Sequence, residues 1–210
     1  MLLLWLYNKN LNLIGSTYKI KEDHIDKYDL NRCINDNIND NNSRYLLLEI
    51  KSTLAPLINR IIEIQNPDKK RIELINGSPF SDDNNNEYKI KKVGEIQNDA
   101  KEERLVLLQN LDPIQPYLYD LYNMNYKIID EKKYVRICLD NFSEDLTPVN
   151  DAFRVIILVD KRFVNSVDMA FLNRLEKMQI NFRDLLDEGQ KKLIKTIMEN
   201  IRLKKEIKKV

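Results

Sequence analysis

The sequence predicts an α/β fold with a mainly parallel five-stranded sheet and helices on both of its faces. Short apolar runs of strand length alternate along the chain with longer segments whose apolar residues recur at helical spacing. Several of the short runs are largely apolar, which is typical of strands that are buried on both faces, and residues 105–108 are apolar throughout. With 210 residues, 43% of them hydrophobic, the chain can enclose the core that such a fold needs.

Five apolar runs are predicted as the strands of this sheet. Arg136 interrupts the apolar character of the fourth run, so we expect that strand at a sheet edge or in a hairpin. The runs cover residues 45–50, 71–75, 105–108, 134–139 and 153–159.

Helices are predicted between and after these strands. Pro56 is tolerated because it falls in the first turn of its helix, and Asp168 stands in an N-cap position. The last helix is amphipathic and continues into a basic tail, in which cations complement the helix dipole. A solvated tail is favoured over a nucleic-acid or lipid site, because no second basic patch supports one. The predicted helices cover residues 54–62, 87–100, 114–122, 168–178 and 190–201.

Two segments rich in Asn and Asp, residues 35–42 and 82–86, are expected to be surface insertions. Asn and Asp side chains bond to the nearby backbone and so compete with regular structure. A calcium loop is the sharper alternative for the first segment, but that segment has no glycine at the sixth position of the loop and lacks a ligand at the third. We therefore do not predict a calcium site there.

The composition excludes several classes of protein. The 34 Lys and Arg residues balance 33 Asp and Glu residues, so no overall field attracts nucleic acid, and we expect no nucleic-acid partner. The two cysteines, Cys33 and Cys138, cannot build a disulfide framework or a four-cysteine zinc site, which favours a reducing compartment. The apolar start, residues 1–7, is too short to span a membrane. We expect a soluble, cytoplasmic chain without a membrane span.

Catalytic and phosphate-binding motifs are also missing. His24 is the single histidine and stands in a polar stretch without a partner, so we expect it at the surface rather than in a catalytic or metal site. None of the four glycines opens a GxxxxGK[ST] or GxGxxG loop, whose backbone N–H groups would bind phosphates. No metal site is predicted.

One motif carries a resemblance. The segment AFLNRLE, residues 170–176, follows the apolar strand 153–159 after a short loop. It resembles the box that follows the sensor strand in AAA+ ATPases, where an arginine reaches toward the γ-phosphate of a neighbouring module. The resemblance implies that Arg174, with Asn173 beside it, is an arginine finger acting in trans, a task that suits a planar and permanently charged side chain. The alternative is that both residues only cap the helix or pair with Asp168, Glu176 or Lys177.

A narrower resemblance covers residues 43–182. The motifs SRYLLL, INGSPF, RLVLLQNLDPIQPYLYDLYN, KKYVRICL, DAFRVIILVDKRFVN and AFLNRLEKMQI occur in this order. The ordered set resembles one AAA+ module of the mysterin family, giant ubiquitin ligases with a string of AAA+ units. This implies an AAA+-like three-layer sandwich and a role in a ubiquitin-transferring machine. The resemblance does not bring ligase chemistry to these residues, because the zinc and cysteine elements of that family are absent from them.

The departures from an active ATPase imply a degenerate module. An ATP-hydrolysing site needs a phosphate loop and an acidic pair at the end of a strand for Mg²⁺ and water, whereas this chain has Gln109 and Asn110 at that position. Asn110 and Asp112 are the residues that would approach a cofactor there, although Asp112 before Pro113 also fits a helix N-cap. We expect ATP and Mg²⁺ to be bound in a neighbouring module and not in this chain.

This resemblance divides the chain into three parts. Residues 1–42 form a polar leader, which fits the closing helices of a preceding module; residues 43–182 form the AAA+-like core; and residues 183–210 form an amphipathic basic helix that starts a helical lid. The expected partners are adjacent AAA+ modules of the same or another chain and, through a parent protein, the ubiquitin machinery. Three alternatives remain: an α/β interaction module, an ATPase whose phosphate loop precedes Met1, and a small independent enzyme with an unidentified acid/base pair.

Overall fold

The computed structural model describes residues 30–65, 71–78, 80, 85–137, 146–164, 167–186 and 188–207. The chain forms two compact units, Met1–Gln179 and Ile180–Val210. The predictions for His24, for Cys138 and for residues 82–84 lie outside the described residues.

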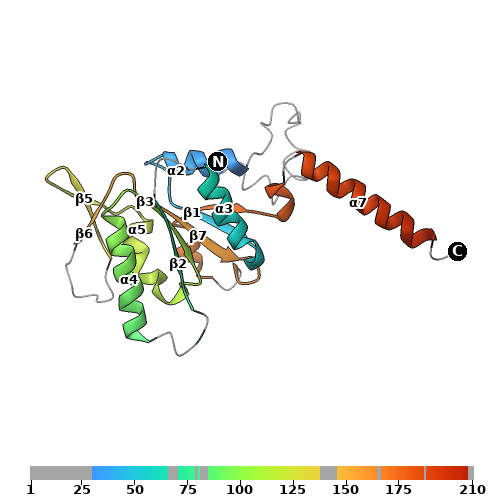
Figure 1. The fold of residues 1–210 in the computed structure, drawn as a ribbon. Coiled ribbons are helices and arrows are strands. Elements are labelled where there is room, and N and C mark those ends of the chain that lie inside the picture. Colours follow the sequence, from blue (N-terminus) through green and yellow to red (C-terminus); the bar gives the residue numbers. More distant parts are fainter. Residues whose placement is uncertain are drawn as a thin grey trace, which may run out of the picture. The chain divides into compact units, whose positions relative to one another are not determined.

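The first unit contains a five-stranded parallel sheet with the strand order β2-β3-β7-β1-β8 (Figure 1). The sequence prediction of a parallel α/β sheet is therefore confirmed. β1 lies between β7 and β8, so chain segments more than a hundred residues apart meet beside it. The strands are β1 Leu46–Ile50, β2 Arg71–Asn76, β3 Arg104–Gln109, β7 Arg154–Asp160 and β8 Glu176–Gln179.

Helical segments cover both faces of this sheet. Val106 and Val155 belong to one core cluster with Ile96 of α4 and Phe171 of α6, whereas the alternating strand residues, such as Leu107, are buried outside that cluster. Because successive strand residues point to opposite faces, the second set packs on the other side, where α2 and α3 contact each other. The helical segments are α2 Leu30–Asn39, η2 Ser52–Leu54, α3 Ala55–Gln65, α4 Asn86–Ala100, η4 Asp112–Leu118, α5 Tyr119–Tyr122 and α6 Met169–Leu172.

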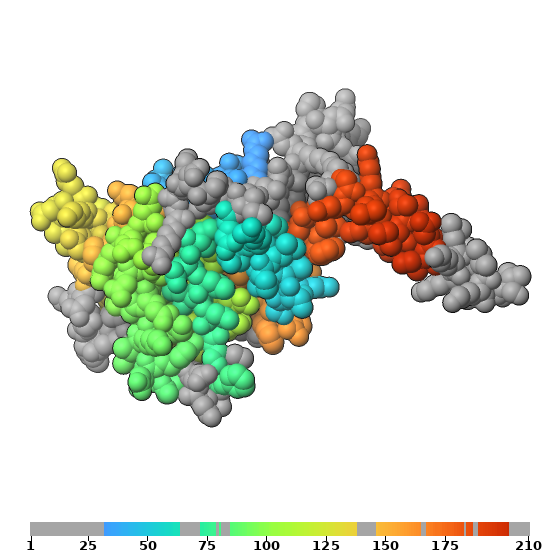
Figure 2. Space-filling view, in the orientation of Figure 1, coloured from blue at the N-terminus to red at the C-terminus, as the bar shows by residue number. Residues whose placement is uncertain are grey.

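A second, antiparallel sheet of three strands joins β3 to β7. It consists of β4 Lys127–Ile129, β5 Lys132–Arg136 and β6 Leu146–Val149. Asp130 and Glu131 make the turn of the β4–β5 hairpin with positive φ angles of 48° and 63°. The hairpin stands out from the rest of the first unit (Figure 2, yellow). The strand predicted at 134–139 thus belongs to a hairpin, as the charge of Arg136 indicated, and not to the main sheet.

The prediction of a helix over residues 168–178 is wrong beyond Leu172. Asp168 does cap α6, since its side chain accepts a hydrogen bond from the Ala170 N–H. Residues from Glu176 onward instead form β8, whose register pairs Glu176 with Leu46 and Gln179 with Glu49 of β1. This pairing with a buried strand outweighs the helical spacing of the apolar residues.

The helix predicted over residues 114–122 is a 3₁₀ segment followed by a single α-helical turn. Pro116 lies inside it and has no N–H to donate to an α-helical ladder.

The first Asn-rich segment is only in part a surface segment: residues 39–42 are exposed, but Asn37 and Ile38 are buried. Residues up to Asn39 form α2, in which Asn37 is 1% exposed. The Asn37 Oδ1 accepts from Nη2 of the buried Arg154 at 3.0 Å, and its Nδ2 donates to Glu176 Oε2 at 2.5 Å. Arg154 also donates to the carbonyls of Ser43 and Arg44. This network joins α2 to the amino-terminal edge of the sheet.

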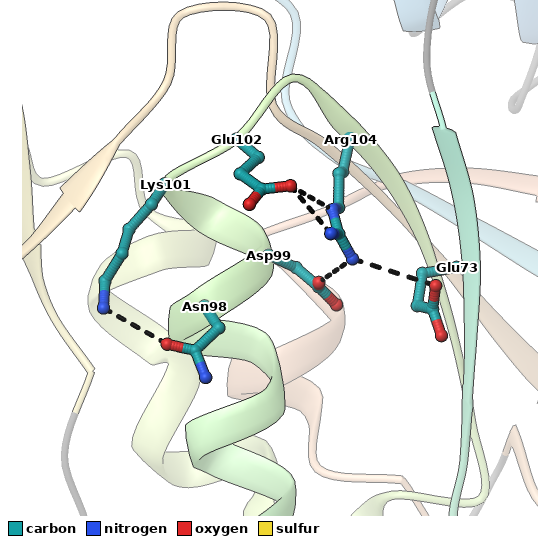
Figure 3. A network of polar contacts seen from close by, with 6 residues as sticks. All are labelled: Glu73, Asn98, Asp99, Lys101, Glu102 and Arg104. Atoms are coloured by element: carbon teal, nitrogen blue, oxygen red, sulfur yellow. Dashed lines mark hydrogen bonds and ion pairs between the residues drawn. The ribbon is translucent and has the colours of Figure 1, made fainter.

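Four charged side chains meet where α4 ends and β3 begins (Figure 3). Arg104 contacts Asp99 at 2.6 Å, Glu102 at 2.7 Å and Glu73 at 3.8 Å. Burial raises the pKa of the Asp99 carboxyl, Arg104 lowers it, and Glu73 raises it again. One cation therefore compensates three carboxylates.

The second unit contains the 3₁₀ segment η6 Phe182–Leu185 and the helix α7 Glu188–Ile207. The helix predicted over residues 190–201 is confirmed. Lys208 and Lys209 of the predicted basic tail lie outside the described residues.

Candidate functional site

The predicted site residues lie at opposite edges of the parallel sheet. Asn110 and Asp112 follow the carboxyl end of β3, whereas Asn173 and Arg174 precede the amino end of β8. Because β3 and β8 run in the same direction in one sheet, these ends are separated by the length of the strands. The fold therefore brings together each pair but not the four residues.

At the carboxyl edge, Asn110 is held in an unusual backbone conformation. Its φ is 54°, in the left-handed region that non-glycine residues seldom adopt, and its Nδ2 donates to Asn76 Oδ1 at 3.2 Å. The Gly77 N–H donates to the Gln109 carbonyl at 2.7 Å, which joins the end of β2 to the end of β3. The amide of Asn110 thus has a partner within the protein.

Asp112 is exposed and lies in the first turn of η4. The N-cap of η4 is Leu111, and no side chain caps the segment. The prediction that Asp112 is a helix N-cap is therefore wrong. No carboxylate stands at the last position of β3, which is occupied by Gln109.

The connection after β1 is short. Lys51 alone separates Ile50, the last residue of β1, from Ser52, the first residue of η2, and α3 follows directly. A phosphate loop between a strand and a helix needs several residues with glycines, whose N–H groups surround the phosphates. This connection has neither the length nor a glycine.

A carboxylate already occupies the start of that helical segment. Asp160, the last residue of β7, pairs in register with Ile50, and its Oδ2 accepts the Ser52 N–H at 3.1 Å. The Arg162 side chain and N–H donate to the same carboxylate at 2.8 to 3.0 Å. These Arg162 bonds, together with that from Ser52, hold the pKa of Asp160 well below its usual range. The N–H at the start of η2 is therefore already bonded to a carboxylate of the chain, and Arg162 balances the charge of that carboxylate.

At the amino edge, the Arg174 side chain lies against an aromatic ring. Its guanidinium carbon is 4.0 Å from the centroid of the Tyr119 ring, and Nη1 donates to the Ala170 carbonyl. The Nε atom is buried without a hydrogen-bond partner. Among the described residues, no carboxylate oxygen lies within ion-pair distance of Arg174, so the predicted alternative of a pair with Asp168 or Glu176 is wrong. The alternative that both residues cap the helix has support, because Asn173 is the C-cap residue of α6 and Arg174 bonds to a carbonyl of that helix.

The Tyr119 ring is itself fixed in place. Its hydroxyl donates to Asp168 Oδ2 at 2.8 Å, and Asp168 Oδ1 accepts the Ala170 N–H at 3.0 Å. Burial and the hydrogen bond to Asp168 raise the pKa of Tyr119. The ring also stacks on Phe171, with the two planes 20° apart.

Two further cations lie beside this turn. Arg44 donates its Nη1 to the carbonyl of Asn173 at 2.7 Å, while the Asn173 side chain is exposed. Lys177 is half-buried in β8, and burial, followed by the charge of Arg44, lowers its pKa. The turn before β8 therefore carries Arg174 with Arg44 bonded to it, together with the carboxylate of Asp168, whose pKa the hydrogen bond from Tyr119 lowers and Arg174 helps to lower.

Sequence reasoning missed Tyr119, Asp160 and Arg44. Tyr119 stands in the predicted helix 114–122, and nothing in the sequence of that segment indicates a contact with Arg174, which lies 55 positions further along the chain. Asp160 ends an apolar strand, which is the one signal that could have identified it, because the carboxyl ends of parallel strands carry binding residues. Among the described residues, no group of three or more acidic, histidine or cysteine side chains could hold a metal ion.

Comparison with known proteins gives a family match over most of the chain. The family described as the RNF213 AAA domain matches residues 35–186. The E3 ubiquitin-protein ligase RNF213 of Mus musculus is 28% identical over 160 residues, and that of Homo sapiens is 27% identical over 159 residues; each match covers 75% of this chain.

A Dictyostelium discoideum protein, whose name describes it as an uncharacterized transmembrane protein, is 29% identical over 188 residues, or 87% of this chain. The chain spans about 3% of the length of each of these relatives. Within the described residues of this chain, no helix is both long enough and apolar enough to cross a bilayer.

Proposed function

This chain belongs to the RNF213 AAA domain family, and on that premise we propose that it is a non-hydrolysing AAA module that offers Arg174 to the nucleotide of an adjacent AAA module. It serves as a structural or allosteric unit of an E3 ubiquitin ligase of this family. ATP and Mg²⁺ belong to the neighbouring module in this proposal.

The observation that carries the proposal is the contact between Asp160 and Ser52. A nucleotide that approached the end of β1 would meet the Asp160 carboxylate, which already accepts the Ser52 N–H, and not a set of free N–H groups. Separating Asp160 from Ser52 and Arg162 to free that N–H would cost the hydrogen bonds between them. In this proposal, the Asp160 carboxylate therefore occupies the hydrogen-bond donor after β1 that would otherwise be available to a phosphate.

The end of β3 supports the same proposal. Hydrolysis needs a carboxylate to hold Mg²⁺ and to orient the attacking water, whereas Gln109 and Asn110 present amides there. An amide cannot act as a base, and the Asn110 side chain is engaged by Asn76. Asn110 and Asp112 are thus remnants of a site in this proposal and do not bind a cofactor.

Arg174 has the properties that a finger acting in trans needs. It precedes β8 at the sheet edge opposite to that of Asp160, and it is only partly buried. Among the described residues, its guanidinium forms no ion pair with a carboxylate, although Asp168, whose pKa the hydrogen bond from Tyr119 lowers, lies near enough for Arg174 to lower that pKa further. Arg44 and Lys177 add positive charge on the same edge.

The whole-protein role follows from the relatives and not from these residues. The mouse and human relatives are named as E3 ubiquitin-protein ligases, and we propose that this chain serves such a ligase, in the cytoplasm, beside further AAA modules.

A phosphate loop that preceded Met1 would have to follow a strand other than the five of this sheet, because all five lie within the described residues.

The experiment that tests the proposal is the replacement Arg174→Ala in the protein that contains this chain and an adjacent nucleotide-binding module. The rate constant kcat for ATP hydrolysis should fall by about 10³-fold, the contribution of an arginine finger, while KM changes little. Asn39→Ala, a change at an exposed position of α2, is the matched control and should leave kcat unchanged. An unchanged kcat in Arg174→Ala would refute the finger.

A second candidate function is a plain protein-interaction module. It is favoured by Ile128 and Ile129 of the protruding β4–β5 hairpin, which are 64% and 44% exposed. Exposed apolar side chains on an edge strand are typical of protein contacts. If this function holds alone, Ile128→Lys should weaken assembly of the parent protein, and Arg174→Ala should have no effect on turnover.

A further inference from the structure

We propose that Tyr119 is the positioning residue of Arg174 and that Asp168 fixes Tyr119 for this task. The inference rests on the proposed function of Arg174 and extends it. Nothing in the AFLNRLE motif predicts this partner, because Tyr119 belongs to the segment between β3 and β4.

An arginine side chain has four rotatable bonds, and fixing it costs conformational entropy. The Tyr119 ring reduces this cost in advance, since the guanidinium lies over it at 4.0 Å from the centroid. The bond from Arg174 Nη1 to the Ala170 carbonyl sets the second point of contact. The guanidinium group of Arg174, which contacts the Tyr119 ring with its face and the Ala170 carbonyl with Nη1, can therefore adopt few orientations.

The ring could not hold the guanidinium if it rotated or shifted. Two contacts hold the ring: the hydroxyl bond to Asp168 at 2.8 Å and the stacking on Phe171. Asp168 is itself fixed, because its Oδ1 accepts the Ala170 N–H at 3.0 Å. Asp168 and Ala170 belong to the same turn as Arg174. The turn therefore carries the arginine, and it also fixes the ring that orients the arginine.

This arrangement leaves the other donors of the guanidinium for an anion. Among the described residues, the Ala170 carbonyl is the one hydrogen-bond acceptor of Arg174, so the Nη2 group has no acceptor within the protein, whereas Nε is buried and is not accessible to a ligand. The chemistry that fits a planar, oriented cation with spare donors is a terminal phosphate that spreads its charge over several oxygens. In the proposed function this is the γ-phosphate bound by the neighbouring module.

The test compares Tyr119→Leu with Tyr119→Phe in the protein that contains this chain and the adjacent module. Tyr119→Leu removes the ring face and should lower kcat for ATP hydrolysis by about tenfold to a hundredfold with little change in KM, as expected for a misplaced group. Tyr119→Phe keeps the ring face but loses the hydroxyl bond to Asp168, so it should lower kcat by an intermediate factor of about threefold to tenfold, because the cation–π contact survives on a less firmly held ring. Wild-type turnover in Tyr119→Phe would refute the role of Asp168. Arg174→Ala, measured in parallel, sets the full loss.

The outcomes separate the two claims. If Arg174→Ala lowers kcat and Tyr119→Leu does not, the positioning role is refuted and the finger stands. If Arg174→Ala has no effect, the proposed function itself fails.

A spectroscopic measurement on the 210-residue chain keeps the inference falsifiable even if Tyr119→Leu does not fold. The Nε–H proton of Arg174 should resonate upfield of an exposed arginine because of the ring current, and Arg174→Lys identifies the signal. A shift typical of a freely rotating arginine would overturn the inference.

Discussion

The carbonyl oxygen of Asn110 occupies the space in which a side chain on Gly77 would lie: a Cβ on Gly77 would be 1.7 Å from that oxygen and 2.5 Å from the carbonyl carbon. The contact joins the ends of β2 and β3. A hydrogen bond joins the same two ends, from the Gly77 N–H to the carbonyl of Gln109, the residue before Asn110. This bond fixes the peptide on which the positive φ of Asn110 depends.

Gly77→Ala should therefore destabilise the fold strongly. The methyl group cannot be accommodated without moving the backbone of both strands, and we expect a loss of about 3 kcal/mol or more in the free energy of unfolding. Urea denaturation measures it. Gly94→Ala is the matched control: nothing lies within 4 Å of a Cβ there, and the residue is inside α4, so alanine should stabilise the protein by about 0.5–1 kcal/mol. Equal effects of the two substitutions would contradict this account.

Arg104→Met should destabilise the protein more as the pH rises. Burial already raises the pKa of Asp99, so the folded state holds its proton more tightly than the unfolded state, and this stabilisation is lost as the pH rises through the folded-state pKa. Without Arg104, the repulsion from Glu73 and Glu102 is uncompensated, and that pKa rises further. We expect a loss of about 2 kcal/mol near pH 7 and a smaller one near pH 4.

Unfolding free energies at the two pH values check this prediction. Asp99→Asn added to Arg104→Met should recover most of the loss at the higher pH, because it removes the buried carboxylate. Glu102→Gln alone should cost well under about 1 kcal/mol, since its side chain is 61% exposed. A loss that is the same at both pH values would show that Arg104 acts by packing and not by charge.

Asn37→Leu should loosen the attachment of α2. The substitution keeps the volume but leaves the buried guanidinium of Arg154 and the carboxylate of Glu176 without their shared amide, which should cost about 2–3 kcal/mol. Asn39→Ala, in the same helix but exposed, should change the unfolding free energy by less than about 0.5 kcal/mol. Comparable losses would mean that the Asn37 network does not hold α2.

The predicted division of the chain into a leader and a core at residue 42 stays a prediction.

The strands that could be predicted from the sequence are those buried on both faces. β1, β3 and β7 each contain at least three consecutive buried apolar residues, and few alternatives exist for such runs between turn signals. β8 could not be predicted in the same way. All four of its residues are half-buried, and it pairs with β1 alone at the edge of the sheet, so its sequence carries no alternation or apolar run. Its identity as a strand comes from β1, some 130 residues earlier.

The polar partners could not be predicted either, because they are set by tertiary contacts. Asn37 looked like part of a solvated insertion, and only the position of Arg154 explains why it is buried. The prediction for Arg174 as a candidate residue came from the motif around it. The ring of Tyr119 beside it depends on how α5 packs against α6, which no spacing within either segment encodes.

We propose above all that this chain does not itself bind a nucleoside triphosphate. Calorimetric titration of the isolated 210-residue chain with MgATP tests this most directly. We predict no binding heat up to about 1 mM ligand, because Asp160 already accepts the Ser52 N–H at the start of η2 and no phosphate loop follows β1. Saturable binding at about micromolar strength, with MgATP located beside Asn110 or Ser52, would contradict it.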